Sequence, residues 1–224
     1  IHTFFQANKK KNNSLYISEY FLSHQFNIDE FEIILEGKAD GIYNEKIPII
    51  EEIKSTDSPL LEFYSKNKRW HLGQAICYAY MYLKEKELSN CKIRLIYISQ
   101  VDKSNDEYVF EYDIKSLEKE IYQYLNDYVK FLRLITEFKE KRNKSCIDLG
   151  FPFSNFREGQ RKLAKYCYSI AKNGGLLFVE APTGIGKTVS TLYPFIKSFK
   201  DEINDKIFYL TAKTSGRLAA FDTV

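Results

Sequence analysis

One group of residues near the start of this sequence has the types and spacing needed to hydrolyse a phosphate ester. Asp40 lies near the end of one apolar run, and Glu52 and Lys54 lie on the next. Two carboxylates can bind a divalent metal ion that activates water and neutralises developing charge, while a lysine positions the nucleophile or stabilises the transition state. Side chains alternate along a strand, so Glu52 and Lys54 should share one face, with Glu51 on the other. The pattern alone is loose, because charged residues on an exposed strand face look the same.

A second group, A-P-T-G-I-G-K-T from Ala181 to Thr188, matches the phosphate-loop pattern with Ala in place of the usual first glycine. It follows an apolar run and precedes an apolar-faced helix, which is the context that such a loop requires. Gly184 and Gly186 let backbone N–H groups surround phosphate oxygens, and the helix N-terminus adds partial positive charge. Lys187 can reach the β- and γ-phosphates, and the Thr188 hydroxyl can hold Mg²⁺. This segment predicts a site for ATP with Mg²⁺.

Three further residues accompany the first group. Gln74 and Tyr78 lie one turn apart on a predicted helix, and His2 precedes the whole set. An upstream His, then G-x-x-D, E-x-K and Q-x-x-x-Y in this order resemble the RecB-like nucleases of the PD-(D/E)XK class. The resemblance implies Mg²⁺ or Mn²⁺ as the nuclease cofactor, with catalytic residues Asp40, Glu52, Lys54, Gln74 and Tyr78 and metal ligands His2, Asp40 and Glu52. A surface histidine remains the alternative for His2.

The phosphate loop also has informative neighbours. R-x-x-Q, from Arg157 to Gln160, opens a predicted helix before it, and Y-L-T-A-K-T ends a predicted strand after it. With the loop, these segments resemble the start of the first motor domain of XPD/DinG-type superfamily 2 helicases. The resemblance implies that Gln160 contacts adenine and that the stretch from Thr211 to Thr214 approaches DNA. The predicted nucleotide-binding residues are Arg157, Gln160, Thr183, Gly184, Ile185, Gly186, Lys187 and Thr188.

Helicase catalysis also needs an acidic Walker B pair and an arginine from a second motor domain, and neither follows the loop in this sequence. We therefore expect this chain to bind nucleotide weakly and not to unwind DNA by itself. An iron–sulfur cluster is expected only beyond these residues. The four cysteines are far apart and form no C-x-x-C pair, which argues against a disulfide framework or a zinc site and favours a reducing cytoplasm.

The composition is that of a globular protein, with 44% hydrophobic and 28% charged residues among 224. No apolar run approaches the roughly 20 residues that a bilayer crossing needs, and the first residues do not form a signal peptide. The formal net charge of +3 does not by itself indicate nucleic-acid binding. The motifs predict DNA as the partner, either single-stranded or with single-stranded ends, and no membrane.

The hydrophobic periodicity predicts an α/β fold in two parts. The first part, residues 1–142, should be a restriction-endonuclease-like mixed sheet flanked by helices. We expect an antiparallel meander, a helix, two strands and a long helix at 15–25, 31–43, 47–55, 70–84, 92–100, 108–112 and around 117–138. Residues 143–155 contain Gly and Pro and are predicted to be a linker. The last part, 156–224, should start a P-loop (RecA-like) parallel α/β unit, with helices at 157–172 and 187–200 and strands at 175–180 and 206–211.

The leading hypothesis is a metal-dependent DNA nuclease of exonuclease type coupled to an ATP-dependent DNA helicase, acting in DNA repair or processing. One alternative is a nucleotide-switched DNA-binding module whose nuclease-like fold no longer cuts. Retention of Asp40, Glu52 and Lys54 argues against that alternative. Another is a P-loop NTPase of a different class, such as a kinase, against which Gln160 and the 211–214 segment argue.

Overall fold

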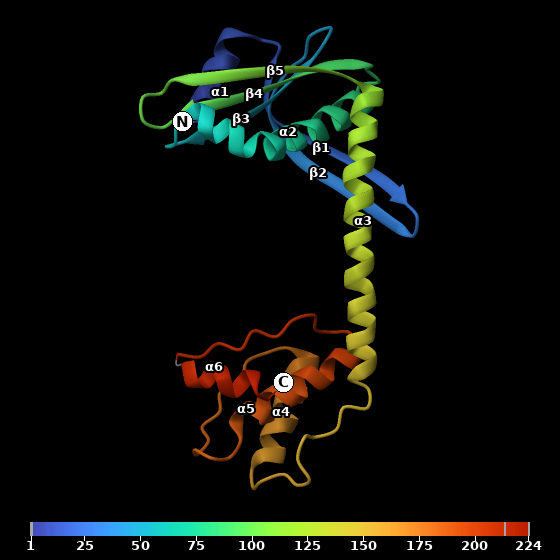
Figure 1. Ribbon diagram of the computed structural model, residues 1–224, viewed down its shortest axis with the longest axis vertical. Coiled ribbons are helices and arrows are strands. Elements are labelled where there is room, and N and C mark those ends of the chain that lie inside the picture. Colours follow the sequence, from blue (N-terminus) through green and yellow to red (C-terminus); the bar gives the residue numbers. More distant parts are fainter. Residues whose placement is uncertain (1, 213, 224) are drawn as a thin grey trace. The chain divides into compact units, whose positions relative to one another are not determined.

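The computed structural model describes residues 2–212 and 214–223, apart from the side chains of residues 2–4, 12 and 215. The chain divides into two compact units, which we call unit 1 (Ile1–Phe131) and unit 2 (Leu132–Val224). Figure 1 labels their helices and strands. Within the described ranges, no helix combines the length and apolar character needed to cross a bilayer.

Unit 1 is built on one five-stranded sheet in which the strands follow one another in sequence order. The strands are β1 (Tyr16–Ile28), β2 (Phe31–Tyr43), β3 (Ile49–Thr56), β4 (Asn90–Ser99) and β5 (Asn105–Asp113). All neighbouring pairs are antiparallel except β3 and β4, which are parallel. A parallel pair needs a long crossover, and the helix between these strands supplies it. The predicted mixed α/β sheet flanked by helices is confirmed.

Helices cover both faces of this sheet. On one face lies α1 (His2–Asn12), where Phe5 packs against Ile53, Ile96 and Ile98. On the other lies the crossover helix α2 (Leu60–Glu85), whose Ala75, Ile76 and Ala79 join the main core. The helix was predicted to begin at Trp70, which was wrong. The helix begins at Leu60, directly after Pro59, whose φ of −52° suits the start of a helix. No glycine or proline interrupts the chain from Leu60 to Leu72, so the helix continues through this stretch.

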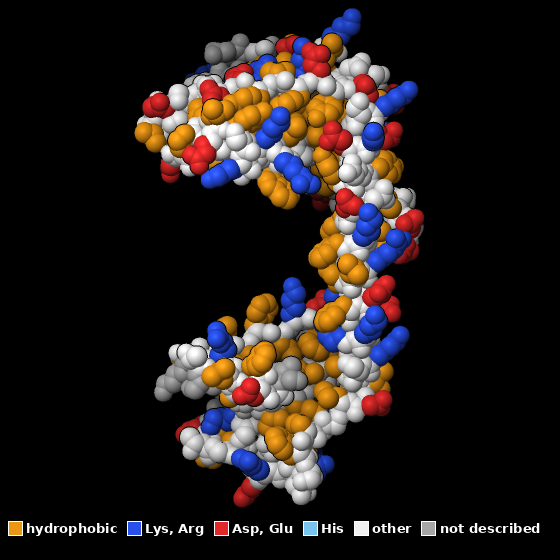
Figure 2. Space-filling model, viewed as in Figure 1, with side chains coloured by type: hydrophobic (Ala, Val, Ile, Leu, Met, Phe, Trp, Pro, Cys, Tyr) orange, Lys and Arg blue, Asp and Glu red, His pale blue; other side chains and the backbone are white. Residues whose placement is uncertain are grey.

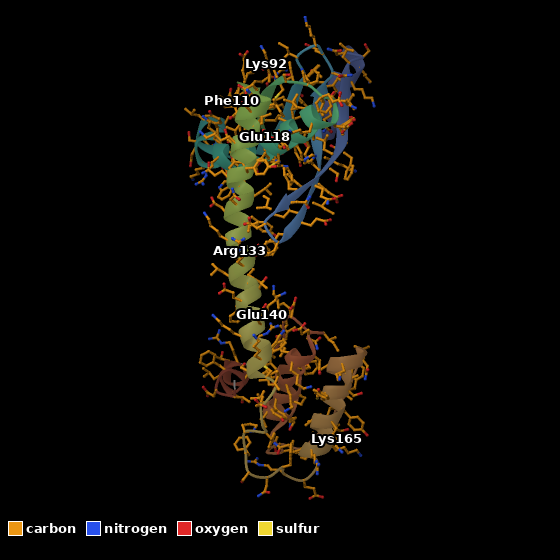
Figure 3. The ribbon with its side chains drawn as sticks, turned by 90° about the vertical axis from the view of Figure 1, so that its right-hand side faces the viewer. Lys92, Phe110, Glu118, Arg133, Glu140 and Lys165 are labelled. Atoms are coloured by element: carbon orange, nitrogen blue, oxygen red, sulfur yellow. The ribbon has the colours of Figure 1, made fainter. Side chains whose placement is uncertain are left out.

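The long helix α3 (Ile114–Ser145) contributes residues to both units. Its unit 1 part buries Leu117, Ile121, Leu125 and Val129 on one stripe, as the apolar periodicity predicts. Figure 3 shows the side chains along this helix, where Glu118 belongs to unit 1 and Arg133 and Glu140 to unit 2. The helix extends past residue 142, where the sequence analysis places the end of the first part.

Unit 2 contains α4 (Gln160–Asn173), α5 (Lys187–Lys197), the short 3-10 helix η1 (Ser198–Asp201) and α6 (Thr214–Phe221). The predicted strands at 175–180 and 206–211 were wrong, because these described residues have no regular secondary structure. A strand forms only when another strand takes up its backbone hydrogen bonds, and an apolar composition does not ensure such a partner. Phe178 and Leu210 are 92% and 90% exposed. The helix–loop–helix portion of the expected parallel unit is present, and residues 175–180 and 206–211, which the structure describes, do not form its parallel sheet.

Candidate functional site

Asp40 lies where two strands of the sheet separate. β2 and β3 pair only from Tyr43 to Gly41, with Gly41 opposite Glu51. Just beyond this point, Oδ2 of Asp40 accepts a hydrogen bond from the backbone N–H of Ile53 at 2.7 Å. The side chain thus satisfies a backbone donor that a paired strand would otherwise satisfy. This bond fixes the Asp40 carboxylate against β3, next to Glu52.

Glu52, which follows Glu51 in β3, is a buried carboxylate with few partners. Its side chain is 1% exposed, and its Oε1 atom forms an ion pair with Nζ of Lys54. Among the described residues, its Oε2 atom has no hydrogen-bond partner, and Oε1 has no partner besides Lys54. Burial raises the pKa of Glu52 to about 7, the charge of Asp40 adds to the rise, and Lys54 opposes it. A buried carboxylate with an unpaired oxygen is costly, and a second cation beside it would reduce that cost.

The neighbouring acid, Glu51, belongs to the opposite face of β3. It is fully buried, and its Oε1 accepts hydrogen bonds from Nζ of Lys9 at 2.7 Å and from Nη1 of Arg94 at 3.1 Å. Burial raises the pKa of Glu51, and Lys9 and Arg94 lower it. Two cations of the protein therefore already neutralise this carboxylate. The alternation places Glu52 and Lys54 together and Glu51 apart, as the sequence analysis expects.

Helix α2 brings Gln74 and Tyr78 to the face of the sheet that carries Glu52 and Lys54. Nε2 of Gln74 donates a hydrogen bond to the Tyr78 hydroxyl at 3.0 Å. The Tyr78 ring packs directly on Gly37 of β2, where an added Cβ would lie 2.6 Å from Cε1 of the ring. Burial raises the pKa of Tyr78, the hydrogen bond from Gln74 lowers it, and the charges of Glu52 and Asp40 raise it further. The tyrosine therefore lies within electrostatic reach of both acids.

Two residues at this centre have contacts that the sequence analysis missed. Gln6 of α1 is buried, and its Nε2 donates to Oε1 of Glu19 at 2.9 Å and to the carbonyl oxygen of Asp40 at 2.8 Å. Glu19 has φ of 55°, and the β1–β2 pairing leaves out Glu19 and Asp40 while its register stays the same on both sides. His71 of α2 lies 3.0 Å from the Tyr97 hydroxyl through Nδ1, and burial and the charge of Lys54 lower its pKa. No sequence signal identifies the first contact, because it depends on how α1 docks.

The donor set can be compared with the needs of a divalent ion. The side chain of His2 lies outside the described residues, so its role as a ligand stays a prediction. In the described part of the chain, no three His, Cys, Asp or Glu side chains gather closely enough to hold a metal. Mg²⁺ is commonly held by one or two carboxylates and several waters. Asp40 and Glu52, whose Oε2 atom lacks a hydrogen-bond partner among the described residues, fit such a site.

The glycine loop of unit 2 precedes α5 directly. Gly184 and Gly186 have φ of 84° and 83°, in the left-handed region that favours glycine. Nζ of Lys187 donates to the carbonyl oxygens of Ala181 and Pro182 at 2.9 Å and 2.8 Å. The lysine therefore folds back across its own loop. Thr183 is exposed and Thr188 half-buried, and Ile185 packs near Gly159.

Arg157 and Gln160 both reach this loop. Nη1 of Arg157 donates to the carbonyl oxygen of Gly184. Gln160 is only 2% exposed, its Oε1 accepts from the Arg157 backbone N–H at 2.9 Å, and its Nε2 lies where a side chain at Gly186 would be. The carboxamide is thus engaged within the protein, and its implied contact with adenine stays a prediction. Of the predicted DNA-approaching segment, Lys213 lies outside the described residues.

Comparisons with known proteins give limited similarity. No protein-family description matches this sequence. A stretch of 51 residues is 43% identical to the probable ATP-dependent helicase MJ0942 of Methanocaldococcus jannaschii, and it makes up 23% of this chain and 8% of that protein. The crystal structure of SSO0001 has 20% identity and a TM-score of 0.37 over 54% of each chain. The sequence match supports a relation to ATP-dependent helicases over that short stretch.

Proposed function

We propose that unit 1 is a metal-dependent nuclease of the RecB-like PD-(D/E)XK kind that cleaves DNA. The observation that carries this proposal is the buried Glu52 carboxylate, which lies beside Asp40, is ion-paired with Lys54 through Oε1 and has no hydrogen-bond partner for Oε2 among the described residues. A protein has little reason to bury a carboxylate in this state unless a further cation binds there. Gln74 and Tyr78 border the same centre from α2.

The residues of the centre would have different roles in this reaction. Asp40 and Glu52 would hold a Mg²⁺ or Mn²⁺ ion, and the backbone bond from Ile53 fixes the direction of the Asp40 carboxylate. A divalent ion there supplies positive charge beside the scissile phosphate and makes a water molecule more acidic. The Lys54 ammonium, held on Glu52, can donate to a phosphate oxygen and stabilise the charge that develops on it. Tyr78 and Gln74 orient the substrate strand beside these groups.

Unit 2 would supply the nucleotide site of a DNA helicase to which the nuclease is coupled. The partial similarity to a probable ATP-dependent helicase supports this proposal, as do the two left-handed glycines before α5. Lys187 donates to loop carbonyls, so a phosphate must draw its ammonium away from Ala181 and Pro182. Coupling would feed a separated strand into the cutting site, in a protein that acts in DNA repair or processing.

The direct test is incubation of the purified chain with end-labelled single-stranded DNA and Mn²⁺ or Mg²⁺. We expect degradation by the wild type and by Lys92→Ala, because Lys92 pairs with Glu111 on an exposed part of the sheet. We expect none by Lys54→Ala. Equal degradation by wild type and Lys54→Ala would contradict the proposal. Binding of DNA that responds to ATP, without cleavage under either metal, would favour a nucleotide-switched binding module instead.

A further inference from the structure

Trp70 is a large apolar side chain that the fold leaves in solvent at the edge of the candidate centre. It is the one tryptophan in the sequence, and it is 72% exposed. It precedes Gln74 by one turn of α2, and Tyr78 follows by one more, so the three residues form a single stripe. One helical turn advances about 5.4 Å along the axis, so Trp70 and Gln74 are neighbouring positions on this side of the helix. The stripe runs from an exposed aromatic ring into the site.

The charge around this ring suits an anionic strand. From Phe63 to Lys84, α2 contains no acidic residue, and its basic residues before the tryptophan are Lys66, which pairs with Glu62, Lys68, which lies over the Tyr64 and Phe110 rings, and Arg69. The Arg69 guanidinium carbon lies 5.8 Å from the centre of the Trp70 ring, within the range of a cation–π contact. Figure 2 shows basic and apolar side chains next to one another over the part of unit 1 where α2 lies.

The residue after the tryptophan, His71, lies against the strand next to β3. Nδ1 of His71 lies 3.0 Å from the hydroxyl of Tyr97, and Tyr97 is the β4 partner of Lys54 in the pairing with β3. The middle of α2 therefore packs against the strand next to the carboxylate–lysine centre.

We infer that Trp70 stacks on an unpaired nucleobase and seats single-stranded DNA at the centre, with Arg69 supporting the ring. This inference rests on the proposed nuclease function and specifies its substrate. Every base has an aromatic face, so such a platform accepts any sequence. In a duplex, those faces are covered by neighbouring bases, so the platform selects unpaired strands. Its role is to bind and position the strand.

The sole tryptophan makes the stacking directly measurable. The full chain is titrated in EDTA, which prevents cleavage, with a short oligothymidylate, with an abasic strand of equal length and with a duplex. Stacking should quench the Trp70 emission with oligothymidylate and leave it nearly unchanged with the other two. Equal quenching by the abasic strand, or binding of oligothymidylate with no change in emission, would overturn the inference.

Variants supply a second measurement, the anisotropy of a labelled oligothymidylate. One base–aromatic stack corresponds to about a 5- to 150-fold change in affinity, so Trp70→Ala should weaken binding within that range. Trp70→Phe should retain most of the affinity, and Phe21→Ala, at a 55% exposed aromatic of β1, should retain all of it. Unchanged affinity of Trp70→Ala would overturn the inference. Quenching without any cleavage would support the stacking role of Trp70 and contradict the nuclease proposal. Cleavage without quenching would support the nuclease proposal and contradict the stacking role.

Discussion

Replacing Glu52 with glutamine should change how the stability of unit 1 depends on pH. The folded protein holds the pKa of this carboxyl at about 7, against an ordinary value of 4.5. Between these values, the unfolded chain releases the proton while the folded chain keeps it, so stability falls as pH rises. At about 1.4 kcal/mol for each pKa unit, the wild type should lose about 3 kcal/mol between pH 4 and pH 8 from this group alone. The glutamine variant has no such proton to release.

The assay is urea unfolding in EDTA, followed through β3 and β4 by pulsed hydrogen exchange and mass spectrometry. This readout isolates unit 1 from unit 2. The difference in free energy of unfolding between wild type and Glu52→Gln should move by about 3 kcal/mol in favour of the variant from pH 4 to pH 8. Adding Mn²⁺ at pH 8 should restore stability to the wild type alone. A pH-independent difference, or one that moves in the opposite direction, would refute the reasoning.

Three further predictions follow from the contacts of single residues. Lys54→Ala removes the charge that lowers the pKa of Glu52, so the pH midpoint of Mn²⁺ binding should move upward; an unmoved midpoint would count against this coupling. Glu51→Ala leaves Lys9 and Arg94 without their shared anion, and urea unfolding should show a loss of about 3–5 kcal/mol, against little change for Glu111→Ala. Gly186→Ala forces a methyl group against Gln160 at a left-handed φ, so binding of a fluorescent ATP analogue should disappear while the helical circular dichroism remains; intact binding would show that the loop tolerates the change.

Local patterns in the sequence are enough to predict much of unit 1. The period of two along 49–56 places Glu52 and Lys54 on one face and Glu51 on the other, because the pleat of a strand alternates its side chains. The stripe of α3 is likewise a property of one helix. What could not be predicted is the contact of Asp40 with the Ile53 backbone, since it depends on two strands separating after Gly41. The anchoring of Gln6 on Asp40 depends on the docking of α1.

Unit 2 shows where apolar composition misleads. Residues 175–180 and 206–211 have the apolar composition of buried strands, but among the described residues no strand takes up their backbone hydrogen bonds. Gln160 illustrates the same limit at the level of one side chain. Its place at the start of a helix indicates an accessible carboxamide, whereas the loop around Gly186 covers it. The neighbours that decide both outcomes are distant in the sequence.

The central claim is that Asp40 and Glu52 together hold a divalent ion, and electron paramagnetic resonance of Mn²⁺ tests it most directly. At pH 8, the wild type should remove free Mn²⁺ from solution. Asp40→Asn combined with Glu52→Gln should not, although the asparagine oxygen can still accept the bond from Ile53 and so preserve the fold. A paired control, Glu107→Gln with Glu111→Gln on β5, should bind as the wild type does. Equal Mn²⁺ binding by the wild type and the Asp40/Glu52 variant would contradict the account.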